Sequence, residues 1–167
     1  NDLHCQVVLD AASAGKHIVC EKPLCLNLRE ADRMIDACKE ANVKLMYAEE
    51  LCFAPKYVRL RQLIEEGALG EIYLLKQSEK HDGPHTPWFW DISRSGGGVT
   101  MDMGCHAFEF FRWLLGKPKV VDIYADMKQV AHSGRTEGDD NSLLVVTFEN
   151  GATGIAEESW AKKGGMD

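Results

Sequence analysis

A lysine directly behind an apolar run is the first candidate for chemistry. Lys22 stands between Glu21 and Pro23, after the run 18–20, which is typical of a buried strand. Ligands of open α/β sheets bind beyond the carboxyl ends of strands, so this lysine would face the ligand crevice. Its compact ammonium group can hold a substrate hydroxyl and stabilise the alkoxide formed during oxidation. The alternative is a solvated lysine in a turn whose geometry Pro23 fixes.

A glycine-rich stretch followed by an aspartate and a histidine is the second candidate. Residues 96–98 are glycines, which allow a backbone to approach a ligand closely. Asp102 and His106 follow, and their spacing puts them on one helix face if the helix begins early enough. A carboxylate beside an imidazole raises its basicity and orients it, as a general base on a carbinol hydroxyl requires. In the alternative, Asp102 caps the helix and His106 packs in the interior.

Residues 1–50 alternate between helix and strand patterns. Apolar spacing predicts a helix over 2–14, a strand over 17–20, a helix that Asn27 caps, and a strand over 43–48. Such alternation favours a parallel α/β sheet.

Residues 51–167 follow a different, α+β pattern. We expect a helix from Pro55, a strand over 72–78, a long polar and aromatic loop over 81–98, and a helix over about 103–115. Long loops inside compact domains are commonly functional. Strands are then expected over 120–127, 142–148 and 152–160, the last two joined at the hairpin signal Asn150-Gly151.

Taken together, these stretches resemble a known family. Glu21-Lys22-Pro23 and the run Gly-Gly-Gly-x-x-x-Asp-x-Gly-x-His over 96–106 resemble the two signatures of the Gfo/Idh/MocA oxidoreductases, which include glucose–fructose oxidoreductase and inositol dehydrogenases. Residues 1–4 look like the end of that family's Thr-Pro-Asn-x-x-His stretch, and 113–116 resembles a family helix ending. The likeness covers essentially the whole chain in order, which makes it more specific than any one motif.

The resemblance implies a fold of class α/β plus α+β. Residues 1–50 would be the C-terminal part of a dinucleotide-binding Rossmann domain, and 51–167 part of an α/β domain with a mostly antiparallel sheet. It implies an NAD(P)-dependent dehydrogenase that takes a hydride from a secondary hydroxyl of a sugar, polyol or related compound. Members commonly associate through that sheet, so a homo-oligomer is expected. The alternatives are a redox-neutral NAD-dependent glycosidase and a non-catalytic binding or assembly module.

The resemblance also implies a set of site residues. Lys22, Asp102 and His106 would be catalytic: His106 takes the hydroxyl proton, Asp102 tunes it, and Lys22 holds the substrate near the nicotinamide. The cofactor, NAD or NADP, would lie beside Asn1, His4, Glu21, Lys22 and Pro23. The family's glycine-rich phosphate loop lies upstream of Asn1, so we expect an internal piece that alone binds cofactor weakly or not at all and is weak or inactive.

The aromatic loop carries candidates for substrate binding. His81, His85, Trp88 and Trp90 could line a sugar site, with the indoles stacking on a ring. No recognised ligand spacing supports a metal site formed by these residues with His106, so no metal is expected.

Composition narrows the partners. The net charge of -7, from 26 acidic and 19 basic side chains, would repel a phosphate backbone, so no nucleic-acid partner is expected. No apolar run approaches the roughly 20 residues of a membrane span, so no membrane partner is expected either. The 6 cysteines form no C-x-x-C pair and are interpreted as reduced core thiols of a cytoplasmic protein. The remaining partner is a small-molecule substrate.

Overall fold

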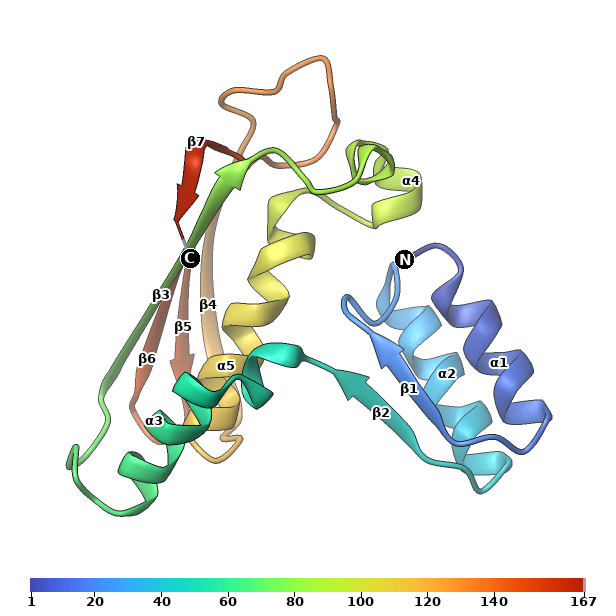
Figure 1. Ribbon diagram of the computed structural model, residues 1–167, viewed down its shortest axis with the longest axis horizontal. Helices are drawn as coiled ribbons and strands as arrows, with labels where there is room; N and C mark the ends of the chain where they lie inside the picture. Colours follow the sequence, from blue (N-terminus) through green and yellow to red (C-terminus); the bar gives the residue numbers. More distant parts are fainter. Residues whose placement is uncertain (167) are drawn as a thin grey trace.

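The computed structural model describes residues 1–166, except for the side chain of residue 166. The chain forms a small parallel sheet with its own helices and a larger sheet with a long helix across one face (Figure 1). Each part has its own buried apolar cluster. The class expected from the sequence, α/β followed by α+β, is confirmed.

The N-terminal part alternates helix and strand as predicted. Its elements are α1 (His4–Ser13), β1 (Ile18–Glu21), α2 (Leu28–Glu40) and β2 (Leu45–Ala48). The strands pair in parallel, with Glu21 opposite Ala48. Asn27 caps α2 as predicted, because its side chain accepts a hydrogen bond of 3.0 Å from the Glu30 N–H. Both helices contribute buried side chains, such as Val8 and Met34, to the cluster around these strands.

The middle of the chain holds mostly short helices. A 3₁₀ turn, η1 (Glu50–Phe53), leads to α3 (Pro55–Glu65) and then to strand β3 (Leu74–Asp82). The expected long loop carries two short helical segments, η2 (Pro87–Trp90) and α4 (Ile92–Ser95). A π-helical turn, η3 (Thr100–Gly104), precedes α5 (Cys105–Leu114), so the predicted helix is present but opens with a wider turn.

The larger sheet is mostly antiparallel, as predicted. Its further strands are β4 (Val120–Lys128), β5 (Asn141–Phe148), β6 (Thr153–Ser159) and β7 (Ala161–Met166). The order is β4-β5-β6-β3-β7, and β3 pairs with β6 in parallel while the other pairs are antiparallel. The predicted hairpin at Asn150-Gly151 joins β5 to β6. Sequence reasoning did not anticipate β7, whose two glycines carry little strand propensity.

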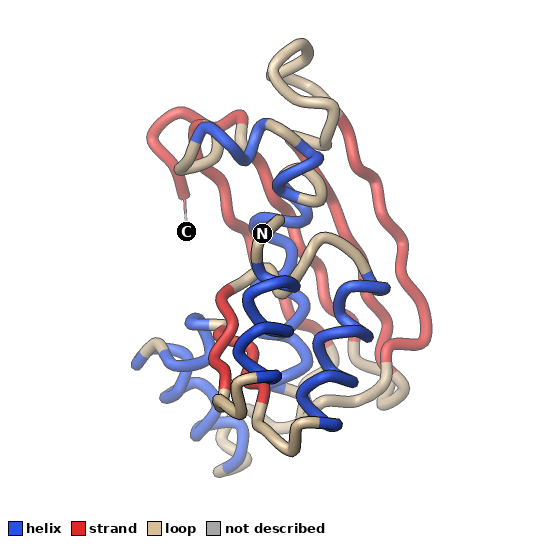
Figure 2. The backbone as a smooth tube through the Cα atoms, turned by 90° about the vertical axis from the view of Figure 1, so that its right-hand side faces the viewer, coloured by secondary structure: helices blue, strands red, loops and turns tan. Residues whose placement is uncertain are grey.

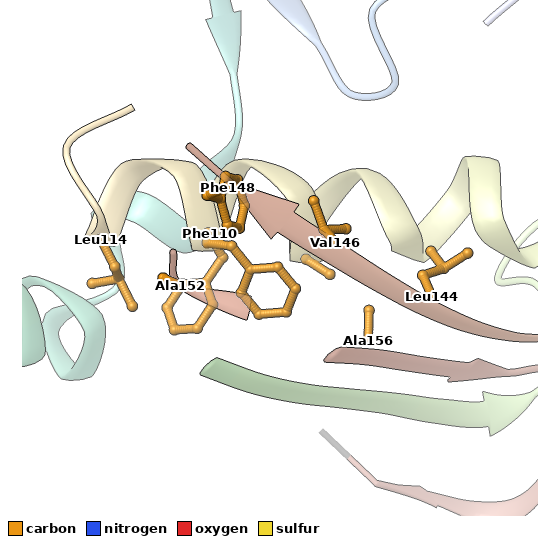
Figure 3. Close-up of a cluster of buried hydrophobic side chains, with 9 residues drawn as sticks. Phe110, Leu114, Leu144, Val146, Phe148, Ala152 and Ala156 are labelled. Carbon is orange, nitrogen blue, oxygen red and sulfur yellow. The ribbon is translucent and has the colours of Figure 1, made fainter. Parts of the chain in front are cut away.

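Helix α5 is fixed to this sheet by an apolar core. Phe110 and Leu114 of the helix pack against Val146 and Phe148 of β5 (Figure 3). Phe111 lies over Gly154 of β6, where an added Cβ would come within 2.4 Å of the aromatic ring. The core therefore holds His106, in the first turn of α5, at a fixed place above the sheet.

The chain's N-terminus lies beside the short helices that precede α5 (Figure 2). Asp2 donates its backbone N–H to Arg94 O over 3.1 Å, and the Arg94 side chain contacts the Asp2 carboxylate at 3.2 Å. All 6 cysteines are free thiols, and 5 of them are buried. Among the helices of residues 1–166, none has both the length and the apolar character needed to cross a membrane.

Candidate active site

Two parallel strands deliver a lysine and a glutamate to one edge. Lys22 directly follows β1 and Glu49 directly follows β2, and the strands are in register at their last residues. Because the carboxyl ends of parallel strands meet at the same edge, both side chains leave the small sheet together. The Lys22-Pro23 peptide bond is cis, and the His4 ring Nδ1 lies 2.9 Å from Pro23 O.

Lys22 forms a part-buried ion pair with Asp102. Its Nζ lies 3.3 Å from Asp102 Oδ1 and 3.1 Å from the Asp102 backbone oxygen. Burial lowers the pKa of Lys22, but the charge and hydrogen bond of Asp102 outweigh it, so the pKa lies above its ordinary value. The other Asp102 oxygen, Oδ2, accepts a hydrogen bond of 3.2 Å from the Trp160 indole. The Lys22 ammonium group is therefore held by Asp102, and the Asp102 carboxylate is itself held by both Lys22 and Trp160.

The carboxylate beside His106 is Glu49, which corrects the expected pairing with Asp102. His106 Nδ1 lies 2.5 Å from Glu49 Oε1, and the residues are only 4% and 2% exposed. Burial lowers the pKa of His106, yet the Glu49 hydrogen bond and charge raise it more, so the net shift is upward. The four-residue spacing of Asp102 and His106 was thus not sufficient to predict their pairing, because the Asp102 side chain contacts Lys22 and Trp160 instead.

His106 opens onto a cleft between η1, α3 and β3. The cleft has a volume of about 570 Å³, and its lining includes Glu50, Tyr57, Gln77 and Glu79. His106 Nε2 lies 3.8 Å from Glu50 Oε1 in this region. Such a volume suits a small polar molecule. The adjacent thiol of Cys105 is no nucleophile at neutral pH, since burial raises its pKa to about 12.

The residues expected beside the cofactor surround the Lys22 turn. Glu21 accepts a hydrogen bond of 3.1 Å from the Lys22 N–H, and His4 is bound to Pro23 O. Asn1 is farther along, where its side chain donates to Ser95 O over 2.6 Å. A part-buried ammonium and imidazole at the carboxyl edge of parallel strands fit the polar nicotinamide end of a dinucleotide.

The four candidates of the aromatic loop divide between two places. The His81 and His85 rings lie 4.6 Å apart, with His81 Nδ1 2.6 Å from Gly83 O. Trp88 and Trp90 pack against the cluster that contains Trp160. Trp90 lines a separate cleft of about 740 Å³, together with residues of the segment 129–137. The structure therefore links the loop to Asp102 through Trp160, but among the described residues that line the His106 cleft there is none of these four.

The glycine run approaches the chain itself at Gly98. A Cβ there would lie 1.9 Å from Asp139 O, and the Val99 N–H donates to the same oxygen over 2.8 Å. The Asp139 side chain also accepts a hydrogen bond of 2.6 Å from the Thr100 hydroxyl. The expected close approach to a ligand is thus, at Gly98, a close approach to the backbone of the β4–β5 connection.

Sequence reasoning missed Glu49 and Trp160. Glu49 could have been found, because it follows the strand 43–48 just as Lys22 follows the strand 17–20. Trp160 carries no comparable signal, since it meets Asp102 from 58 positions away.

A paired lysine and a paired histidine lie between parallel strands and a mostly antiparallel sheet, an arrangement that suits a dinucleotide-linked oxidoreductase. Comparison with known families agrees. Residues 1–49 match the model described as "Oxidoreductase family, NAD-binding Rossmann fold", and residues 57–167 match the "GFO/IDH/MocA C-terminal domain". The chain therefore belongs to the Gfo/Idh/MocA family of NAD-binding oxidoreductases.

Two of the named relatives are dehydrogenases. The chain is 32% identical to myo-inositol 2-dehydrogenase of Thermotoga maritima, over 93% of this chain and 46% of that protein. Levoglucosan dehydrogenase of Pseudarthrobacter phenanthrenivorans is 30% identical, over 94% of this chain and 46% of the enzyme. The chain thus spans about half the length of the curated relatives it matches.

Solved structures show the same arrangement. GenD2 from gentamicin A biosynthesis, in complex with NAD, has a TM-score of 0.90 and 31% identity, covering 98% of this chain and 46% of that one. Aldose-aldose oxidoreductase from Caulobacter crescentus, complexed with glycerol, has a TM-score of 0.89 and 29% identity, covering 98% of this chain and 49% of that one.

Proposed function

We propose that the protein carrying this chain is an NAD- or NADP-dependent dehydrogenase. Its substrate would be a secondary alcohol of a sugar, polyol or related compound. The observation that carries this proposal is that Lys22 and His106 lie close enough for their charges to interact, each held by its own carboxylate, and that His106 lines a cleft of about 570 Å³. A fixed ammonium and a fixed imidazole are the groups that alcohol oxidation needs at the carbinol oxygen.

In this proposal each residue has a separate task. His106 takes the proton of the substrate hydroxyl, and the Lys22 ammonium stabilises the negative charge that develops on that oxygen. Asp102 holds Lys22 in place. When bound, the nicotinamide accepts the hydride of the carbinol carbon. We assign the cofactor side to Asn1, His4, Glu21, Lys22 and Pro23, and the substrate side to His81, His85, Trp88 and Trp90.

The wider organisation follows the same proposal. We place the boundary between the cofactor part and the substrate part at residues 50 and 51, between β2 and α3. Exposed apolar side chains on β4, such as Val121, Ile123 and Tyr124, support association of copies through the larger sheet. The free cysteines support a cytoplasmic location.

The test is the formation of NADH or NADPH by the full-length protein with a panel of inositols, anhydrosugars and aldoses. We expect net cofactor reduction that depends on the alcohol and is lost in His106→Ala. Substrate cleavage without net reduction would replace the dehydrogenase with a redox-neutral enzyme. A lack of binding of either cofactor by calorimetry would instead favour a binding or assembly module.

A further inference from the structure

Glu49 is the buried acid for which the proposed reaction has not yet been given a role. It lies between β2 and η1, it is 2% exposed, and its Oε1 meets His106 Nδ1 at 2.5 Å. The only other hydrogen bond to this oxygen in the described chain is a long one of 3.4 Å from the Leu51 N–H. The second oxygen, Oε2, is buried without a hydrogen-bond partner among the described residues. The histidine is thus the principal partner of this carboxylate.

The contact determines which ring nitrogen of His106 faces the cleft. An ionised carboxylate only accepts hydrogen bonds, so His106 Nδ1 must carry the hydrogen. In the neutral ring this leaves Nε2 as the free base. The cleft lies on the Nε2 side, where Glu50 Oε1 is 3.8 Å away and 59% of its side chain is exposed. Glu49 therefore holds the tautomer in which the basic nitrogen is directed toward the cleft.

The same contact balances the charge that proton uptake creates. When His106 takes a proton, the imidazolium lies against a carboxylate in a site almost closed to water, where charges interact strongly. Asp102 is not available for this task, because Lys22 and Trp160 occupy its oxygens. The two carboxylates thus have different partners: Asp102 pairs with the Lys22 ammonium, and Glu49 pairs with the His106 ring.

We propose that Glu49 is the positioning residue of His106, fixing its ring orientation and its proton affinity for the reaction. This inference rests on the proposed function for its catalytic consequence, but the effect on the histidine itself is independent of that function. The titratable groups around His106 come from the end of β1, the end of β2, η1, α3, β3, η3 and α5, and they are Lys22, Glu49, Glu50, Lys56, Tyr57, Glu79, Asp102 and Cys105.

The first experiment is an NMR titration of the His106 ring in this chain, with His106→Ala for assignment. Glu49→Gln keeps the shape and loses the charge, so we expect the pKa of His106 to fall by about one unit or more. Glu50→Gln is the matched control, because it removes a neighbouring but exposed charge and should cause a smaller fall. Equal shifts in the two variants would overturn the proposal. Glu49→Asp retains the charge and should restore most of the raised pKa, even if Glu49→Gln unfolds.

The second experiment measures kcat/KM against pH in the full-length protein with a substrate it oxidises. In Glu49→Gln we expect the acid limb to move to lower pH, following the ring pKa, and the plateau to fall about tenfold or more. A merely structural role would lower the melting temperature and leave the acid limb in place, which would contradict the inference. If the full-length protein oxidises no alcohol, the dehydrogenase proposal fails, while the NMR titration still decides the effect of Glu49 on His106.

Discussion

Trp160 donates its indole N–H to Asp102 Oδ2 over 3.2 Å, and its side chain is fully buried. The contact joins the residue between β6 and β7 to the turn before α5. Trp160 also meets Phe89 and Trp90 edge-on, with ring centroids 5.9 and 5.3 Å apart. One side chain thus supports the Lys22–Asp102 pair and the aromatic loop together.

Trp160→Phe should therefore weaken both stability and activity. The change removes a donor to a buried carboxylate, which costs about 1–3 kcal/mol, and the smaller phenyl ring also leaves a cavity at a fully buried position. Urea unfolding measures the stability loss, and kcat/KM reports the loosened Lys22–Asp102 pair. Trp113→Phe is the control, because that indole packs on the α5 core and Arg61 rather than on a carboxylate. Equal losses of activity in the two variants would contradict a special role for the Trp160 hydrogen bond.

Replacing Lys22 tests whether its ammonium group takes part in the proposed alcohol oxidation. In Lys22→Met the stem is kept and the charge is lost, so we expect kcat/KM for alcohol oxidation to fall about 100-fold or more. Asp102 is then left without its cation, so unfolding should become easier as well. Lys39→Met, which removes an exposed lysine paired with Asp36, should change neither quantity. Retained activity in Lys22→Met would remove this residue from the catalytic set.

Glu158 should make the fold less stable at higher pH. Burial, aided by the charge of Glu79, raises its pKa to about 8, and the residue is 1% exposed. The folded state holds a proton that the unfolded state releases near pH 4.3, so unfolding becomes easier as pH rises from there to about 8. In Glu158→Gln there is no carboxyl group to titrate, so this decrease in the free energy of unfolding with rising pH should be absent. We expect similar stability to the parent at pH 5 and a gain on the order of 1–3 kcal/mol at pH 8.5.

The neighbouring Glu157 supplies the control for that experiment. It forms an ion pair with Lys80, whose hydrogen bond and charge lower the pKa of Glu157. Its contribution therefore has the opposite sign: it is present above the ordinary glutamate pKa and lost as pH falls. Glu157→Gln should not raise stability at pH 8.5. A parallel pH dependence of Glu158→Gln and the parent would show that Glu158 is ionised in the fold.

Gly98 should tolerate no side chain. In Gly98→Ala the new Cβ would meet the backbone oxygen of Asp139 at 1.9 Å, so the glycine run or the β4–β5 connection must shift. We expect a loss of about 3 kcal/mol or more in the free energy of unfolding, measured with urea. In Gly97→Ala the new Cβ would meet only the Met101 side chain, whose Cβ lies 3.1 Å away, so this change should cost far less. Comparable losses at the two positions would be inconsistent with the close approach described here.

Local patterns predicted most elements of this fold. The apolar spacing over 2–14 and the cap at Asn27 reflect interactions within a few residues, so helices α1 and α2 could be read directly. The hairpin at Asn150-Gly151 is equally local. By contrast, the parallel pairing of β3 with β6 joins Leu74 to Thr153 and has no local signature. The strand β7 was missed because Gly164 and Gly165, which have positive φ, give no strand signal along the sequence, and because its pairing with β3 is a tertiary contact.

The candidate site shows the same division. The motif residues Lys22, Asp102 and His106 do meet in one region, as their resemblance to a known pattern implied. Their partners were not all predictable, because the charged groups select one another by distance in the fold and not by spacing along the chain. Asp102 lies four positions from His106, yet it binds Lys22 from 80 positions away. The tertiary structure, and not the spacing along the chain, therefore determines which carboxylate pairs with Lys22 and which with His106.

The Lys22–Asp102 and Glu49–His106 pairs each join a residue near the small sheet to one near α5. The two apolar cores, in contrast, do not share side chains. The candidate reactive centre therefore depends on how the two parts of the chain lie against each other, and neither apolar cluster alone determines it.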